Sequence, residues 1–144
     1  MIRHYTPEDQ AALLRLIILN TPMYFTAAEL KDYEAYLSHE IEDYFVFEQA
    51  GSVIGAGGIN YFNDQRMARL SWDVVHPDHQ KKGVGSQITR HRLNHIRKNP
   101  AVDTVMVRTS QLVFKFYEKF GFVLANTSKD YWGKGFDLYE MKLG

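Results

Sequence analysis

The chain has 144 residues, 17 basic and 17 acidic side chains, and no cysteine. Without cysteine it can form no disulfide, no thiolate metal site and no cysteine nucleophile, and no apolar run approaches the roughly 20 residues that span a membrane. We therefore expect one globular domain over residues 1–144, in the cytoplasm and without a membrane partner.

The zero net charge hides an asymmetry between the two halves of the chain. Residues 1–64 hold three basic and ten acidic side chains, whereas residues 65–144 hold fourteen basic and seven acidic ones. An acidic half suits a cationic partner and a basic half suits an anionic one. Each charge taken singly could equally belong to a solvated surface.

The first part of the chain predicts a strand followed by two helices. Residues 1–5 favour a short strand, and a Thr-Pro pair then begins a helix over 6–20, where apolar residues recur with helical spacing. A capping box, Thr26 with Glu29 three residues later, begins a second helix over 26–37.

The middle of the chain predicts three consecutive strands. Runs rich in β-branched and aromatic residues cover 44–49, 53–61 and 68–75, and short turn sequences at 50–52 and 62–65 separate them. Strands joined by such tight turns form an antiparallel meander.

The last part predicts two further helices and three further strands. A Gly at position 121 is a favourable residue just after a helix. The helices are expected over 83–98 and 111–120, and the strands over 104–108, 122–126 and 138–143. The whole order, β-α-α-β-β-β-α-β-α-β-β, predicts an α/β fold with a mixed sheet and helices on its faces.

The loop over residues 80–85, Gln-Lys-Lys-Gly-Val-Gly, has the features of a phosphate site. Its glycines lack the Cβ that would keep a ligand from the backbone. The first N–H groups of the helix that follows have no partner within the helix and carry the positive end of its dipole. Such a helix start binds phosphate, and the two lysines add positive charge.

Two motifs resemble the GNAT superfamily of N-acetyltransferases. The stretch LSWDVVHPDHQKKGVGSQI is similar to the family's strand, loop and helix signature, and FKFYEKFGF is similar to its second signature, a helix with a Tyr followed four residues later by Gly-Phe. Their separation and the order of the elements also match. The resemblance implies the GNAT fold, and acetyl-coenzyme A as the acyl donor.

In the family, backbone N–H groups of the glycine loop hold the cofactor's pyrophosphate. The pantetheine arm lies along the end of the preceding strand, which is splayed from the strand here expected at 104–108. Where the family often has Asn, this chain has Ser110, whose side chain is shorter. The resemblance places coenzyme A against Val74, Val75, Gln80, Lys81, Lys82, Gly83, Val84, Gly85, Ser86, Ser110 and Phe114.

Acetyl transfer to an amine needs a neutral amine, a polarised thioester and a proton for the departing thiolate. Tyr117 matches the family's general-acid Tyr, although an aromatic at this position of a helix is also a typical core residue. Strand alternation places Leu70, Trp72 and Val74 on one face and Asp73 on the other, so Asp73 is a candidate general base. A water relay and the acidic N-terminal half are the alternatives. The backbone N–H near Val75 is a candidate oxyanion donor.

The acceptor is expected to contact the first two helices and nearby strand ends, where acidic and aromatic residues suit a cationic amine. The candidates are Tyr24, Phe25, Glu29, Tyr33 and Tyr61, although a helix with a solvated acidic face would show the same pattern. We expect a small-molecule amine acceptor, and possible alternatives are a protein amine or a domain that senses acetyl-coenzyme A without turnover. A homodimer is expected because family members are often dimers.

Two further signals predict no additional function. His91 and His95 have metal-ligand spacing, but no third ligand accompanies them, so we expect no metal. Arg90, Arg92 and Arg97 make the helix basic, which we interpret as a face that attracts the cofactor's phosphates. The neutral chain has no nucleic-acid recognition motif, so no nucleic-acid partner is expected.

Overall fold

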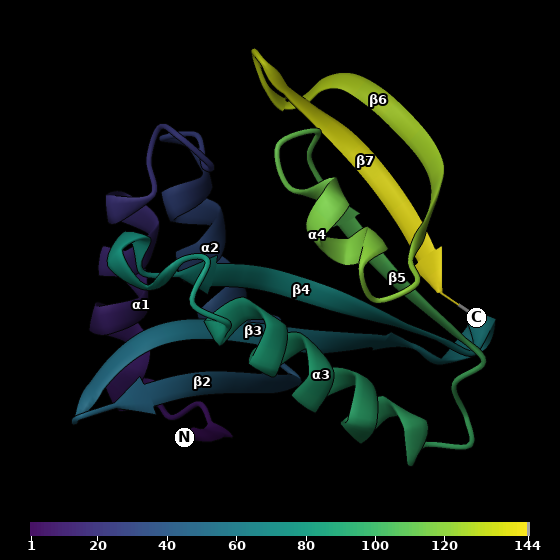
Figure 1. Cartoon of the computed structure of the whole chain (residues 1–144), viewed down its shortest axis with the longest axis horizontal. Coiled ribbons are helices and arrows are strands. Elements are labelled where there is room, and N and C mark those ends of the chain that lie inside the picture. Colours follow the sequence, from purple (N-terminus) through teal and green to yellow (C-terminus); the bar gives the residue numbers. More distant parts are fainter. Residues whose placement is uncertain (144) are drawn as a thin grey trace.

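The computed structural model describes residues 1–143 as a seven-stranded mixed sheet with helices on both of its faces (Figure 1). The strands lie in the order β1-β2-β3-β4-β5-β7-β6. They are β1 (Ile2–His4), β2 (Asp43–Gln49), β3 (Ser52–Phe62), β4 (Met67–Val75), β5 (Thr104–Thr109), β6 (Val123–Gly133) and β7 (Phe136–Leu143). The helices are α1 (Gln10–Leu19), α2 (Glu29–His39), α3 (Val84–Arg97) and α4 (Phe114–Glu118). The predicted fold class and element order are confirmed.

Helix starts account for most of the shifted boundaries. The first helix begins with a 3-10 turn over Pro7–Asp9, and α2 begins at Glu29 because the capping box closes a separate turn, with the Thr26 N–H donating to Glu29 Oε1 at 2.9 Å. Before α4, the N–H groups of Val113 and Phe114 both donate to the Ser110 carbonyl. This turn takes up residues that we had predicted as the first turn of the helix.

The sheet buries a separate apolar core on each face. Helices α3 and α4 cover one face, where Phe45, Ile59 and Leu70 pack with Leu93 and Tyr117. Helices α1 and α2 cover the opposite face with a cluster of aliphatic and tyrosine side chains; among them are Leu13, Ile17, Tyr33, Tyr36, Tyr44 and Val74. Two faces covered by helices explain why the central strands are apolar nearly throughout.

A β-bulge in β4 changes which residues share a face. The register between β3 and β4 shifts between Ala56 and Gly58, and Trp72 takes a left-handed φ of 49°. As a result Trp72 packs with the α1/α2 cluster, whereas Leu70 packs on the α3/α4 side. The predicted grouping of Leu70 with Trp72 and Val74 is therefore wrong, because an extra residue in one strand reverses the alternation beyond it.

The central strands β4 and β5 are parallel and pair over only part of their length. Their register runs from Met67 opposite Thr104 to Leu70 opposite Val107 and ends there. Beyond this point the two strands diverge toward α4 (Figure 1). The predicted splay is confirmed, and it leaves the last five residues of β4 without a partner on the β5 side.

The chain ends in a long hairpin of β6 and β7, and the second of these strands pairs with β5. The side chain of Gln111 ties the hairpin tip to the turn before α4, since it donates to Gly135 O at 2.7 Å and accepts from the Asp137 N–H at 2.9 Å. Within residues 1–143, no helix is both long and apolar enough to cross a membrane.

Candidate active site

A cavity of about 1050 Å³ opens where β4 and β5 separate. Its walls come from the end of β4, the start of α3, the turn before α4, helix α2 and the β6–β7 hairpin. Many predicted site residues meet here: Tyr24, Phe25, Glu29, Asp73, Val74, Val75, Gln80, Lys81, Gly83, Gly85, Ser86, Ser110 and Tyr117. Segments distant in the sequence therefore form one continuous site.

The backbone of Val75 points into this cavity. The N–H of His76 donates to Ile54 O at 2.8 Å, so the pair formed by Val75 and Gly55 is one that makes no hydrogen bond across the two strands. Hydrogen-bonded and non-hydrogen-bonded pairs alternate in an antiparallel ladder. The Val75 N–H is thus directed away from β3, toward the gap.

Two amide side chains hold the Val75 carbonyl, one of which sequence reasoning missed. Asn20, buried at the end of α1, donates to Val75 O at 3.0 Å, and Gln80 donates to the same oxygen at 3.2 Å. Gln80 also donates to Asn20 Oδ1 at 2.8 Å. In the sequence, an Asn directly after the last apolar residue of a predicted helix indicates a helix end and gives little sign of a contact with a distant strand. Its amide joins α1 to β4 and to the glycine loop.

The glycine loop has the backbone geometry of an anion cradle. Lys81 has a φ of 64° and Gly83 a φ of 88°, and α3 begins directly after Gly83. Successive N–H groups in such left-handed turns converge on a common point, and the first N–H groups of α3 point the same way. A Cβ on Gly85 would lie 3.4 Å from Phe116, so Gly85 lets the helix start lie close against this ring in the cavity wall.

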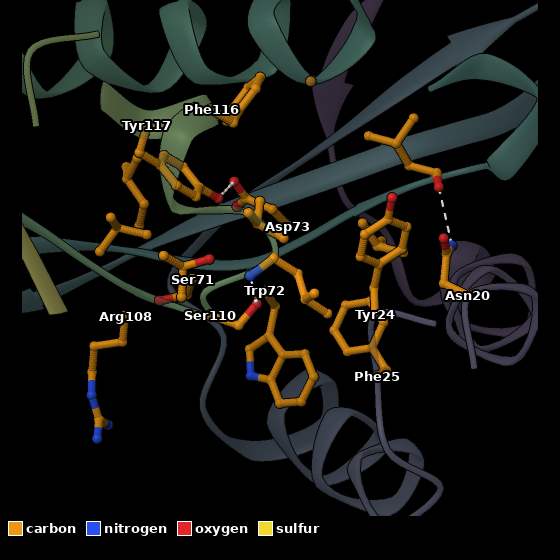
Figure 2. Close-up of a pocket in the computed structure, with 18 of the residues that line it drawn as sticks. Asn20, Tyr24, Phe25, Ser71, Trp72, Asp73, Arg108, Ser110, Phe116 and Tyr117 are labelled. Atoms are coloured by element: carbon orange, nitrogen blue, oxygen red, sulfur yellow. Dashed lines mark hydrogen bonds between the residues drawn. The ribbon is translucent and has the colours of Figure 1, made fainter. Parts of the chain in front are cut away.

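Tyr117, Asp73 and Arg92 form a chain of polar contacts beside the gap. The Tyr117 hydroxyl donates to Asp73 Oδ2 (Figure 2). Arg92 donates to Asp73 Oδ1 at 2.5 Å and to Asp73 Oδ2 at 2.7 Å, and also to the Gly58 carbonyl at 3.1 Å. The bulge makes this contact possible, because it turns Asp73 toward α3.

The arginine of this group is wholly buried, contrary to its predicted place on a basic helix surface. Arg92 is 0% exposed and lies in the buried stripe of α3 with Ile88 and Ile96. Arg92 lies four residues from both of these apolar residues, and this helical spacing already indicated that it shares their buried face. Gly57 provides the space for its guanidinium, since a Cβ there would lie 2.9 Å from Arg92 Cζ.

Burial and charge set the protonation state of the phenol. Burial, followed by the negative charge of Asp73, raises the pKa of Tyr117 well above its ordinary value of 10.0. The positive charge of Arg92 acts against this shift. The phenol therefore keeps its proton at neutral pH, and it faces a cavity that can hold a leaving group.

Comparisons with known proteins agree with this geometry. Residues 5–144 match the family model of the acetyltransferase (GNAT) domain. The chain belongs to the GNAT acetyltransferase family. The resemblance to the GNAT superfamily is thereby confirmed.

The curated relatives that this GNAT domain matches are amino-acid acetyltransferases. The chain is 30% identical over 124 residues to the amino-acid acetyltransferase of Pasteurella multocida, covering 86% of this chain but 27% of that protein. It therefore spans about a quarter of the length of the curated relatives it matches.

Two solved structures share the fold at low identity. The ribosomal-protein-S18-alanine N-acetyltransferase of Escherichia coli has a TM-score of 0.81 and 19% identity, and the match covers 99% of this chain and 92% of that one. An aminoglycoside 6'-N-acetyltransferase in complex with coenzyme A has a TM-score of 0.78 and 14% identity, with 99% and 96% covered.

Some predicted site residues of the GNAT domain lie elsewhere. Tyr33 is buried beneath the sheet, and its hydroxyl contacts that of Tyr44 at 2.6 Å; Tyr44 in turn donates to the Trp72 carbonyl. Tyr33 thus supports the bulge and does not line the cavity. Tyr61 also lies outside it, and its hydroxyl donates to Asp43 at 2.6 Å.

The expected cofactor residues also separate into lining and supporting positions. Phe114 packs against Tyr139, with ring centroids 4.8 Å apart, and Phe116 takes its place in the cavity wall. Val84 is buried beneath the loop and Lys82 is exposed outside the lining, so only their backbones belong to the cradle. Ser110 lines the cavity, and its Oγ accepts from the Leu112 N–H at 3.2 Å, which leaves its own O–H to donate.

The other side of the cavity is aromatic and charged. Phe25 stacks on Trp72 with an angle of 12° between the rings, and Tyr24 lies beside it (Figure 2). Burial raises the pKa of the Glu29 carboxyl, which lines the same side and accepts the Thr26 N–H. Within residues 1–143, no group of three or more His, Asp or Glu side chains is arranged to hold a metal ion.

Proposed function

We propose that this domain transfers the acetyl group of acetyl-coenzyme A directly to the primary amine of a small, amino-acid-like metabolite, with Tyr117 as the general acid. The observation that carries this proposal is that the protonated Tyr117 phenol, the Val75 N–H and the glycine loop open onto one cavity. The named relatives that are amino-acid acetyltransferases support the class of acceptor.

The cavity offers matched groups for each part of the donor. N–H groups of residues 81–86 suit the pyrophosphate. The pantetheine amides would pair with the edge of β4 that faces the gap, as an added strand does. The Ser110 hydroxyl is a further donor on the opposite wall.

In the reaction, the neutral amine nitrogen bonds to the thioester carbonyl carbon, and the Val75 N–H stabilises the negative oxygen of the tetrahedral intermediate. The carbon–sulfur bond then breaks, and the thiolate takes the proton of the Tyr117 hydroxyl. The proton lost by the amine passes to a carboxylate in the cavity wall, and water returns a proton to the phenolate. No covalent enzyme intermediate is needed.

The contacts of Asp73 give it a different role from the general base that its position in the sequence suggested. Both of its carboxylate oxygens already accept hydrogen bonds, from Arg92 and from Tyr117. We propose that Asp73 positions the phenol. Glu29 has a carboxyl of raised pKa in the cavity wall and is the better candidate to receive the proton of the amine.

The replacement Tyr117→Phe tests the role of the phenol. We expect kcat to fall by about 100-fold or more, which is the usual contribution of a positioned acid, while the KM for acetyl-coenzyme A stays within a factor of about two. Release of free coenzyme A against amino acids, polyamines, aminoglycosides and short peptides is the assay.

The outcomes separate the alternatives. Turnover of peptides alone would show a protein acetyltransferase. If the wild-type protein released no coenzyme A with any amine but bound acetyl-coenzyme A tightly, it would be a sensor and the proposal would be refuted. If Tyr117→Phe lost cofactor binding rather than turnover, Tyr117 would be structural.

A further inference from the structure

Two half-buried arginines line the cavity on the acceptor side, and neither makes a hydrogen bond to a carboxylate in the described part of the chain. Arg69 lies on β4 and Arg108 on β5, and both belong to the cavity wall. Within residues 1–143 the Arg69 guanidinium has no carboxylate at salt-bridge distance. Arg108 Nε is buried without a hydrogen-bond partner, and the nearest carboxylate oxygen, on Glu140, is 3.9 Å away.

The register of the sheet brings the two side chains together. Arg69 is opposite Met106, and Arg108 is two residues further along the same strand, so the two arginines share one face. Their neighbours Leu70 and Val107 form the last pair before the strands separate, and both pack on the α3/α4 side. The arginines therefore face the other way, toward α2, at the point where the gap begins.

Figure 2 shows the resulting division of the cavity. Arg108 and Trp72 extend to one side of the strands, and Phe116 and Tyr117 lie on the other. The proposed donor groups and the two arginines therefore approach the gap from opposite faces. A molecule held by the arginines would meet the thioester from the side that the cofactor leaves open.

Aromatic rings hold both guanidiniums in place without using their N–H groups. Arg69 Cζ lies 4.8 Å from the centre of the Phe62 ring, and Arg108 Cζ lies 5.0 Å from that of Tyr131 and 5.6 Å from that of Trp132. Stacking on a ring occupies the flat face of a guanidinium and leaves the donors at its edge for another partner.

The arrangement is electrostatically unfavourable as it stands. Burial, and after it the positive charge of Arg108, lower the pKa of the Arg69 guanidinium. Two partly buried cations beside each other cost free energy unless an anion compensates them. A planar carboxylate matches the fork of an arginine and accepts from it bidentately.

We infer that Arg69 and Arg108 form a subsite for a carboxylate of the acceptor, so that the domain acetylates amines that also carry a carboxylate, as free amino acids do. This inference rests on the proposed function and adds to it the feature that separates amino acids from other small amines. The carboxylates of Glu29 and Asp32 line the α2 side of the same cavity, where the amine end of such a zwitterion would be favoured.

The test compares glycine, leucine, lysine and glutamate with their α-carboxamides in the coenzyme A release assay. For the wild-type protein we expect kcat/KM to be at least about tenfold higher for the best free acid than for its amide. In Arg69→Gln and in Arg108→Gln, kcat/KM for the acid should fall about 10- to 100-fold, the usual effect of one charge-assisted hydrogen bond. Turnover of the amide and the KM for acetyl-coenzyme A should change little.

Two controls exclude a merely structural effect. Arg15 is exposed on α1 and outside the cavity, so Arg15→Gln should keep the preference for the acid. Because the half-buried Arg69 has no carboxylate of the described residues at salt-bridge distance, Arg69→Gln should keep or raise the melting temperature while activity falls. If the arginine only stabilised the fold, its replacement would lower the melting temperature and would not change the preference for the acid over the amide.

The failures are distinguishable. If the wild-type protein acetylates acids and amides equally, or if both arginine variants keep the preference, the carboxylate subsite is refuted and the acetyltransferase proposal stands. If no small amine is acetylated at all, the proposed function fails. Calorimetric titration of the coenzyme A-loaded protein with N-acetylglycine and N-acetylglutamate then tests the subsite separately. The subsite is refuted if neither compound binds to the wild-type protein, or if both arginine variants still bind them.

Discussion

The buried pair of Arg92 and Asp73 gives the sharpest test of the site's architecture. Arg92 is 0% exposed, and Asp73 supplies the carboxylate that compensates its charge through two hydrogen bonds. Replacing Asp73 by Ala leaves a buried guanidinium without its partner. Removing one member of a buried ion pair costs about 3–5 kcal/mol, against a total stability of about 5–15 kcal/mol for a domain of this kind.

The assay is urea unfolding at pH 7 followed by circular dichroism, for wild type, Asp73→Ala, Arg92→Met and the double variant. In the double variant no charge is left unpaired, so the cost should be well below the sum of the two single costs. Arg66 and Asp103 form a matched control, because they make a similar two-bond ion pair on the surface, with side chains 52% and 63% exposed.

Asp103→Ala should hardly move the urea midpoint, since exposed ion pairs are screened by solvent. The reasoning would be refuted if Asp73→Ala were no more destabilising than Asp103→Ala, or if the two single effects at Asp73 and Arg92 simply added. In either case the charge of Arg92 would be compensated in some other way, and the bulge that brings Asp73 to it would have another cause.

Two further substitutions separate stability from function. Gly85→Ala should raise the free energy of unfolding by up to about 1 kcal/mol, because Ala is the better helix former. It should also raise the KM for acetyl-coenzyme A several-fold, because the new Cβ fills space between the helix start and Phe116 in the cavity wall; an unchanged KM would place the pyrophosphate elsewhere. Glu29→Gln keeps an acceptor for the Thr26 N–H. Since burial raises the pKa of Glu29, the neutral side chain is favoured in the folded state, so wild type should lose stability relative to Glu29→Gln as pH rises from about 4 through that raised pKa. Equal stability of the two proteins at pH 4 and at pH 8 would contradict this account.

The local sequence determined the helices and strands and the glycine loop before α3. Helix starts such as the Thr-Pro step and the capping box, and the glycines of the loop before α3, act through neighbouring residues, so their effects could be predicted from spacing alone. The same is true of the two motifs that identified the family. Strand β6 was predicted too short because most of its side chains are exposed, which leaves no apolar alternation to detect.

Tertiary structure decided which side chains reach the cavity. Alternation along β4 predicted that Leu70 and Asp73 lie on opposite faces, whereas both face α3, because the bulge at Trp72 depends on the partner strand and on the tyrosines beneath it. Arg92 gave the pattern of a charged surface, and only packing shows that a carboxylate from a strand compensates it. Arg69 and Arg108 are 39 positions apart, and the parallel register of β4 and β5 places them together. Sequence patterns indicate contacts between residues of one helix or strand. The two arginines come from different strands, so only the pairing of these strands brings their side chains together.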